Sequence, residues 1–193
     1  GLGDVYKRQI LEGAERAKAA KPDLVEFRVD WYEEAADSKK VVALLEKLRK
    51  CLGELPVLFT FRSSREGGEA ALSDGAYQSL NEAAIASGFV DCVDVELFSG
   101  DAVVKAVVAA AHSNHVKVIA SNHDFEKTPA AEELLARLQK MEALGADIPK
   151  IAVMPQSSKD VLTLLTVTES WKETGKTPVI TMSMAGEGLI SRL

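Results

Sequence analysis

The sequence predicts an α/β fold, specifically a (β/α)8 TIM barrel that is incomplete here, with about six of its eight βα units. Two observations lead to this prediction. Helix-like and strand-like segments alternate along the whole chain, and strands joined by crossover helices run parallel. Charged residues occupy every second position of several strands, whereas an open sheet covered by helices on both faces has almost continuously apolar strands.

The helices are predicted from apolar residues spaced at i, i+3, i+4 and i+7. Residues 38–50 show this spacing clearly, with Val41, Leu44, Leu45 and Leu48 on one face. The same criterion predicts helices at residues 10–20, 38–50, 77–87, 102–112, 128–144 and 159–172.

Glycine and proline mark several helix ends. Gly88 and Gly145 each follow an apolar-periodic segment, where a left-handed residue commonly ends a helix. Thr128 and Pro129 are expected to begin a helix, because proline is favoured in the first turn. Two glutamates follow, and their charge suits the positive end of the helix dipole.

The strands are predicted at residues 24–30, 57–62, 89–97, 116–123, 148–154 and 178–184. Alternation gives each of the first five a polar and an apolar face. In the first strand, Glu26, Arg28 and Asp30 lie opposite three apolar side chains. The corresponding faces of later strands carry Thr60, Arg62, Cys92, Asp94, Glu96, Ser121, His123 and Lys150.

The charged faces favour a barrel, because helices need the apolar face to pack on. In a barrel, charges near strand C-termini lie at the mouth of the active site. A two-layer sandwich with its polar face in water remains open on this pattern. A complete barrel takes eight strands and roughly 250 residues, whereas this chain has 193 residues and six predicted strands. We therefore expect a partial barrel domain at residues 10–193, after an uninformative segment at residues 1–9.

Composition excludes several classes of protein. The chain has 23 Lys and Arg against 29 Asp and Glu, a net charge of −6, and the absence of a basic run argues against nucleic-acid binding. No apolar run approaches the roughly 18 residues of a membrane span. Two cysteines do not form a disulfide framework, so we expect a reducing cytoplasm. No ligand spacing predicts a metal site.

Lys150 and His123 are the candidate chemical groups. A lysine in an apolar strand is costly unless it is paired or neutral, and a neutral amine can attack a ketone to form an imine. The alternative is a lysine that extends from the strand to water. His123 ends a strand, which suits acid–base chemistry, although a structural histidine bonded to backbone remains open. Arg62 precedes a charged, glycine-containing loop that either approaches a ligand or is a solvated turn.

From about residue 22 to its end, the sequence resembles type I 3-dehydroquinate dehydratase. The blocks that carry the resemblance are LVEFRVD (24–30), LFTFRSSREGGE (58–69), VDVELF (93–98), SNHDFEKTP (121–129), GADIPKIAVMP (145–155), and ITMSM with ISRL (180–193). The resemblance implies a (β/α)8 barrel and a homodimer. It also implies a cofactor-independent lyase that converts 3-dehydroquinate to 3-dehydroshikimate, in the shikimate pathway to chorismate and aromatic amino acids.

The resemblance also implies roles for individual residues. Lys150 forms a Schiff base with the substrate ketone, His123 moves protons in a syn elimination, and Glu66 orients His123. The implied substrate-binding residues are Glu26, Arg28, Arg62, Met182, Met184 and Arg192, with Arg192 binding the carboxylate.

Both ends of the chain depart from the family pattern. The first strand of the family should precede the helix near residue 10, and residues 1–9 do not resemble it. The eighth strand, the closing helices and a substrate-covering loop should follow residue 193. We therefore expect this chain alone to be weakly active or unstable, with two unpaired sheet edges.

Two other functions remain open at this point. A class I aldolase-type barrel would also use a strand lysine, but the later part of the chain lacks a glycine pattern for a phosphate site. A non-catalytic barrel that binds quinate-like acids for regulation would have no need of the nucleophile.

Overall fold

The computed structural model describes residues 2–186 and 188–192 and contains the six helices and six strands that the sequence predicts. The helices are α1 (Leu2–Ala19), α2 (Ser38–Leu52), α3 (Asp74–Ala86), α4 (Asp101–Ser113), α5 (Ala131–Ala143) and α6 (Ser158–Thr174). The strands are β1 (Val25–Arg28), β2 (Val57–Thr60), β3 (Cys92–Glu96), β4 (Lys117–Asp124), β5 (Ile148–Val153) and β6 (Ile180–Ser183).

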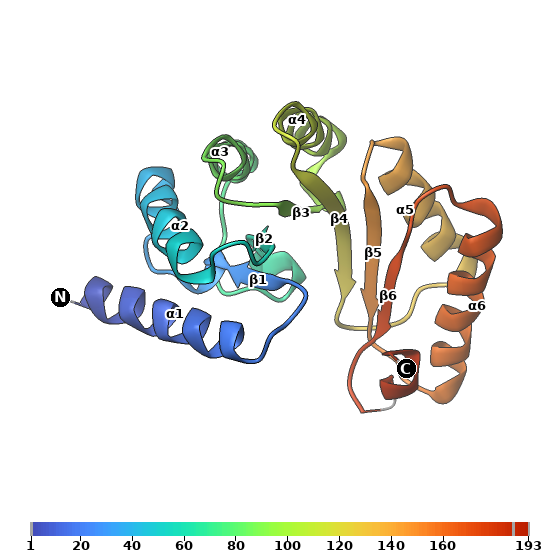
Figure 1. Ribbon diagram of the computed structural model, residues 1–193. Coiled ribbons are helices and arrows are strands. Elements are labelled where there is room, and N and C mark those ends of the chain that lie inside the picture. Colours follow the sequence, from blue (N-terminus) through green and yellow to red (C-terminus); the bar gives the residue numbers. More distant parts are fainter. Residues whose placement is uncertain (1, 187, 193) are drawn as a thin grey trace. The chain divides into compact units, whose positions relative to one another are not determined.

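The chain divides into two compact units. The first comprises Gly1–Asp94 and Ala106–Lys117, and the second comprises Val95–Lys105 and Val118–Leu193. The strand order is β1-β2-β3-β4-β5-β6, and each strand is separated from the next by a helix (Figure 1). Sequential parallel strands with intervening helices are the arrangement that a (β/α)8 barrel requires.

In the first unit, parallel pairing joins β1 to β2 and β2 to β3. Helices α1 and α2 pack on each other, and α2 packs on α3 (Figure 1). The predicted apolar face of α2 is buried, because Val41, Leu44, Leu45 and Leu48 are all almost fully enclosed. Asp37 begins this helix by accepting hydrogen bonds from two backbone N–H groups of the first turn, which otherwise lack partners.

In the second unit, β5 pairs in parallel with β4 on one side and β6 on the other. Helix α5 packs on β5, and α6 packs on β6 and on α5 (Figure 1). The buried residues of α5 are Leu134, Leu138 and Met141, at the spacing of one helix face. Trp171 of α6 is also buried, and its indole N–H donates to the carbonyl of Thr177. Each helix therefore covers its strand with an apolar stripe.

Three helix starts differ from the sequence prediction by more than one residue. Helix α3 begins at Asp74 rather than residue 77, and the Ser73 side chain caps it by accepting from the N–H of Ala76.

Helix α1 begins at Leu2 rather than residue 10, and Lys7 and Arg8 in the added part pair with Glu34 and Glu12.

Helix α5 begins at Ala131 rather than at Thr128. The Thr128 hydroxyl donates to the carbonyl of Met154 at 3.0 Å, which ties this segment to the end of β5. A residue before proline also avoids the helical region.

Strands β1 and β2 end two residues earlier than predicted, and β3, β5 and β6 end one residue earlier. Short 3-10 turns follow β1 at Val29–Trp31, β2 at Ser64–Glu66 and β3 at Leu97–Ser99. In these turns, successive side chains no longer alternate between the two faces of the sheet. The charged residues after β1 and β2 must therefore be placed by their contacts.

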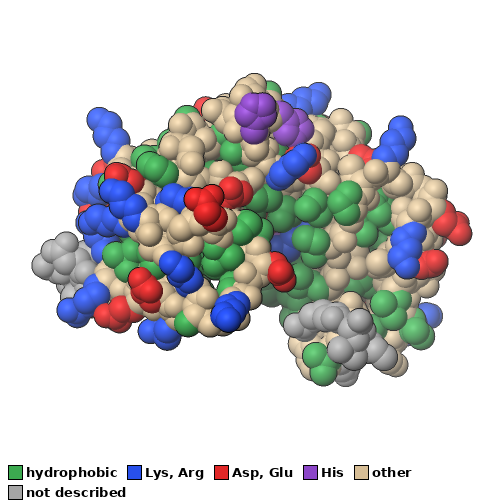
Figure 2. Space-filling model, viewed as in Figure 1, with side chains coloured by type: hydrophobic (Ala, Val, Ile, Leu, Met, Phe, Trp, Pro, Cys, Tyr) green, Lys and Arg blue, Asp and Glu red, His purple; other side chains and the backbone are tan. Residues whose placement is uncertain are grey.

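The surface of the first unit is rich in charge. Lysine and arginine side chains gather over α1 and α2 in Figure 2. Several are paired with carboxylates, as Lys50 is with Glu46 at 2.7 Å, but exposed pairs of this kind contribute little to stability. No helix in the described residues has both the length and the apolar character needed to cross a membrane.

Candidate functional site

The first unit carries a polar face across its three strands. The register pairs Arg28 with Thr60, and Thr60 with Asp94, and residues paired in this way share a face of the sheet. Glu26 lies on the same face, and its carboxylate accepts a hydrogen bond of 2.7 Å from the Thr60 hydroxyl. The predicted charged face of these strands is therefore present.

Arg62 follows β2 and lies at the centre of a buried group of charges. Its Nη2 is 2.8 Å from Oδ1 of Asp94, and its Nη1 is 3.7 Å from Oε2 of Glu66. All three residues are at most 4% exposed. Burying ionised groups is expensive even when they are paired, so such groups often mark a functional site.

Glu66 is held in a tightly folded loop. It lies in the 3-10 turn after β2, which ends at Gly67 in the left-handed conformation. The next residue, Gly68, lies so close to the end of β2 that a Cβ there would be 1.8 Å from the carbonyl oxygen of Arg62. Glycine therefore permits the close approach that buries Glu66 beside Arg62.

Arg28 is bound by Asp30, which has no predicted role in the sequence analysis. The Arg28 Nε and Nη2 each lie 2.7 Å from a different carboxylate oxygen of Asp30. Alternation had placed Asp30 on the face of Glu26 and Arg28, but its partners depend on the turn after β1. The hydrogen bond to Asp30 raises the pKa of Arg28, so its guanidinium stays charged.

The second unit places Lys150 and His123 on one face of its sheet. Lys150 pairs with Ser121, and His123 lies two residues further along β4, so the side chains of Lys150 and His123 point to the same side. Neighbouring strands are about 5 Å apart and each residue advances about 3.3 Å. The two residues are therefore neighbours on one face of the sheet.

Met182 and Met184 lie beside this pair on β6 and just after it. Met182 pairs with Ala152, which shares the face of Lys150, and the Met184 N–H donates to the carbonyl of Val153 at 2.8 Å. Both methionines are half-buried. Arg192 belongs to the 3-10 turn Leu189–Arg192, and its side chain lies outside the described part of the molecule.

The opposite face of β4 holds a second polar contact that the sequence did not predict. Asn122 is buried, and its side-chain oxygen accepts a hydrogen bond of 2.5 Å from Arg137 of α5. The Arg137 guanidinium also lies 5.2 Å from the ring centre of Phe98. On the other side of the strand, His123 stacks with Phe125 at 6.4 Å between ring centres. Residues adjacent to His123 therefore fix the end of β4.

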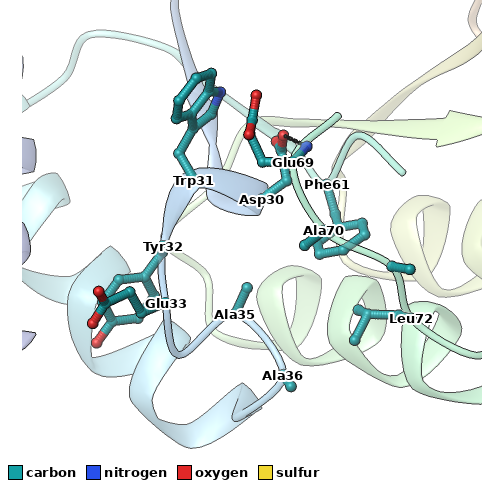
Figure 3. A pocket seen from close by; sticks show the side chains of 11 residues that line it. Asp30, Trp31, Tyr32, Glu33, Ala35, Ala36, Phe61, Glu69, Ala70 and Leu72 are labelled. Atoms are coloured by element: carbon teal, nitrogen blue, oxygen red, sulfur yellow. Dashed lines mark hydrogen bonds between the residues drawn. The ribbon is translucent and has the colours of Figure 1, made fainter. Parts of the chain in front are cut away.

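A pocket of about 440 Å³ opens in the first unit beside Asp30 (Figure 3). The residues that line it come from the segments after β1 and after the Glu66 loop, with Phe61 between them. Among the described residues, no three His, Cys, Asp or Glu side chains are grouped so that they could hold a metal ion.

Comparison with known proteins shows what kind of molecule carries these groups. The sequence model of the type I 3-dehydroquinase family matches residues 6–193. A 3-dehydroquinate dehydratase of Listeria innocua is 56% identical over 184 residues, covering 95% of this chain and 73% of that protein. One of Escherichia coli O139:H28 is 57% identical over 172 residues, covering 89% of this chain and 68% of that protein.

Solved structures agree with the sequence comparison. The type I 3-dehydroquinate dehydratase of Clostridium difficile superimposes with a TM-score of 0.95 and 50% identity, covering 97% of this chain and 74% of that one. The 3-dehydroquinate dehydratase of Enterococcus faecalis gives a TM-score of 0.92 at 41% identity, covering 96% and 78%.

The fold and the relatives together define a lyase built on a (β/α)8 barrel, of which this chain forms part. The chain belongs to the type I 3-dehydroquinate dehydratase family of the shikimate pathway. The predicted fold class and enzyme class are thereby confirmed, and the dehydratase is favoured over the aldolase alternative. The family match begins at residue 6, earlier than the resemblance recognised from residue 22.

Proposed function

We propose that this chain dehydrates 3-dehydroquinate through a Schiff base on Lys150. The amine adds to the C3 ketone and water leaves, which gives an iminium. His123 takes the C2 proton, and the electrons of that C–H bond flow into the iminium. His123 then donates the proton to the departing C1 hydroxyl, so a second water leaves in a syn elimination. Hydrolysis of the imine consumes one water and releases 3-dehydroshikimate, so the net loss is one water.

The observation that carries this proposal is the shared face of Lys150 and His123. The register puts a nucleophilic amine and an imidazole on neighbouring strands and on one side of the sheet. The proton on C2, the carbon next to the imine carbon, must be reached by a base that stands beside the lysine. The iminium itself serves as the electron sink, so this route needs no further cofactor.

The family relationship supports a covalent route. The Clostridium difficile relative is described with covalently modified comenic acid. A fold that supports covalent modification of a small carboxylic acid is consistent with a Schiff-base enzyme.

The remaining assignments concern binding. We assign the ring hydroxyls of the substrate to Glu26, Arg28 and Arg62, because these polar groups share one face or the loop after it in the first unit. Arginine can bind carboxylates and hydroxyls with paired N–H donors. We assign the substrate carboxylate to Arg192, by family resemblance alone.

Three further residues complete the proposed site. Met182 and Met184 supply an apolar wall, in keeping with their half-buried positions beside the Lys150 face. Glu66 would orient His123. This last assignment also rests on the family resemblance, and the burial of Glu66 in a tight loop supports a fixed position for its carboxylate.

Borohydride trapping tests the proposal directly. The chain is incubated with 3-dehydroquinate and sodium borohydride, digested and analysed by peptide mass spectrometry. We expect one reduced adduct, on the peptide that contains Lys150. The variant Lys159→Met, which removes an exposed lysine of α6, should trap normally, whereas Lys150→Met should not. An adduct on another lysine, or none at all, would rule out the mechanism.

We extend the proposal to assembly and location: a homodimer in the cytoplasm. The family resemblance supports the dimer. Cys51 and Cys92 form no disulfide with each other, which is consistent with a reducing compartment. Sedimentation velocity tests the homodimer. A particle with the mass of one 20.8 kDa chain at micromolar concentration would contradict it.

A further inference from the structure

Asp30 connects two parts of the proposed substrate site. It is fully buried as a side chain and holds the Arg28 guanidinium with both oxygens, at 2.7 Å each. We propose that Asp30 is a positioning residue for the reaction, whose carboxylate fixes Arg28 and the loop of Arg62 and Glu66 in one arrangement. This inference rests on the substrate-binding roles proposed above for Arg28 and Arg62.

The second set of contacts runs from Asp30 to that loop. The backbone N–H of Arg62 donates to Oδ1 at 3.3 Å, and the backbone N–H of Glu69 donates to Oδ2 at 3.1 Å. Figure 3 shows the Glu69 contact as a dashed line. These two residues are the first and last of the segment that contains Glu66. One carboxylate therefore anchors both ends of the loop and Arg28 at the same time.

The loop between these anchors is internally tight. Ser63 accepts hydrogen bonds from the N–H groups of Glu66 and Gly68, and the Ser64 N–H donates to Ala70. A Cβ on Gly68 would overlap the carbonyl of Arg62. A loop that is closed on itself in this way moves as one piece, so displacing its anchor displaces Glu66 and Arg62 together.

A pocket borders the far side of the loop. The pocket in Figure 3 separates Ala35 and Ala36, after β1, from Ala70 and Leu72, after the loop. Beside the pocket, the hydrogen bonds of Asp30 to Arg62 and Glu69 join the two segments.

The charge of Asp30 is maintained in this setting. Burial by itself raises the pKa of a carboxyl group, but hydrogen bonds from Arg28 and from the backbone of Glu69 and Arg62 outweigh it and lower the pKa of Asp30. An amide in the same place has the same shape, but it has no charge and directs an NH₂ group at a guanidinium or an N–H. Asp30→Asn therefore removes the anchoring with little change in volume.

The test compares Asp30→Asn with a matched control in the same unit, Asp91→Asn. Asp91 also accepts from an arginine and from a backbone N–H, namely Arg49 and Val57, but it precedes β3 rather than following a strand. We expect Asp30→Asn to lower kcat/KM about 10- to 100-fold, as a misplacement of about 1 Å can. Asp91→Asn should stay within about twofold of wild type, although both variants lose thermal stability.

A double-mutant cycle with Arg28→Met separates positioning from general destabilisation. If Asp30 acts through Arg28, Asp30→Asn lowers kcat/KM much less in the Arg28→Met background than in wild type. The two losses in kcat/KM should differ by about tenfold or more. Asp30→Glu, which keeps the charge, should recover part of kcat/KM. Independent, multiplying losses would overturn the inference, as would equal activity losses in the Asp30 and Asp91 variants.

Borohydride trapping at Lys150 distinguishes a failure of this inference from a failure of the proposed function. If wild type forms the Lys150 adduct and Asp30→Asn retains full kcat/KM, only the role of Asp30 is wrong. If wild type forms no adduct at Lys150, the Schiff-base function is wrong, and the positioning role falls with it.

Discussion

The two ends of the strands use similar carboxylates for different purposes. Before β3, Asp91 accepts from the N–H of Val57 at 2.8 Å and returns its own N–H to the carbonyl of Val57. Before β5 in the second unit, Asp147 makes the same reciprocal pair with Val118. Asp91 also accepts from Arg49 of α2. After β1, Asp30 binds Arg28 of the polar strand face and two N–H groups of a loop.

This difference suggests that carboxylates before a strand serve stability, whereas those after a strand serve the proposed function. At the N-terminal ends, Asp91 and Asp147 join neighbouring strands through backbone groups, which fixes the register. At the C-terminal ends, the charges act on other side chains and lie on the face that carries Arg28 in one unit and His123 in the other. Barrel enzymes place chemistry at the C-terminal ends of their strands, and the roles proposed above for Arg28 and His123 follow this rule.

The largest effect is expected for Lys150→Met. Without the amine no imine can form, so we expect kcat to fall by at least about 10⁴-fold. The ultraviolet absorbance of the conjugated enone product measures the rate. Lys159→Met on the exposed side of α6 is the control and should retain normal kcat. Substantial turnover by Lys150→Met would show that the C-terminal face of the second unit is not the site of chemistry.

His123→Gln should have the next largest effect. Loss of a general acid–base group lowers rates by about 10²- to 10⁴-fold, while Lys150 can still form the imine. We therefore expect low kcat together with continued borohydride trapping at Lys150, read by peptide mass spectrometry. Normal turnover would remove His123 from the mechanism, and loss of trapping would mean that it also acts before the imine.

The fold was largely predictable because it depends on local periodicity. All six strands and six helices lie where alternation and helical spacing predict them, and the buried face of α2 matches residue by residue. The starts of α1, α3 and α5 were wrong. In α5, the contact of Thr128 with Met154 decided the start, and a contact 26 residues away leaves no local signal.

The site was predictable only in part, for the same reason. Alternation put Asp30 on the charged face, but its contacts to Arg62 and Glu69 span 32 and 39 residues. Alternation puts Asn122 on the face opposite His123, but its hydrogen bond with Arg137 depends on how α5 packs on the sheet. The sequence therefore predicts which face of a strand each residue occupies. The partners of the buried charged residues can be identified only from the tertiary structure. The roles assigned to Lys150, His123 and Glu66 remain predictions.

Substitutions at the N-terminal ends should affect stability without affecting rate. Asp91→Ala and Asp147→Ala each remove a hydrogen bond between a carboxylate and a backbone N–H. The expected loss is about 1–2 kcal/mol in the free energy of unfolding, or roughly 2–8 °C in Tm for a chain of this size. Calorimetry and steady-state kinetics measure the two quantities. A tenfold fall in kcat/KM with unchanged Tm would contradict the proposed division between strand ends.

The last prediction is a pH dependence that belongs to the C-terminal end of β1. The pKa of Asp30 is lower in the folded chain than its ordinary value of 3.8. Ionised Asp30 therefore stabilises the fold fully above about pH 5, and this contribution is lost as the pH falls through the folded pKa.

The stability difference between wild type and Asp30→Asn, measured by urea unfolding, isolates this contribution. It should be about 1–3 kcal/mol at pH 7 and should shrink below about pH 4. Asp91→Asn serves as a comparison at the other strand end. A difference that stays constant down to pH 3, in chains that remain folded, would show that the carboxylate charge of Asp30 does not hold Arg28 and its loop.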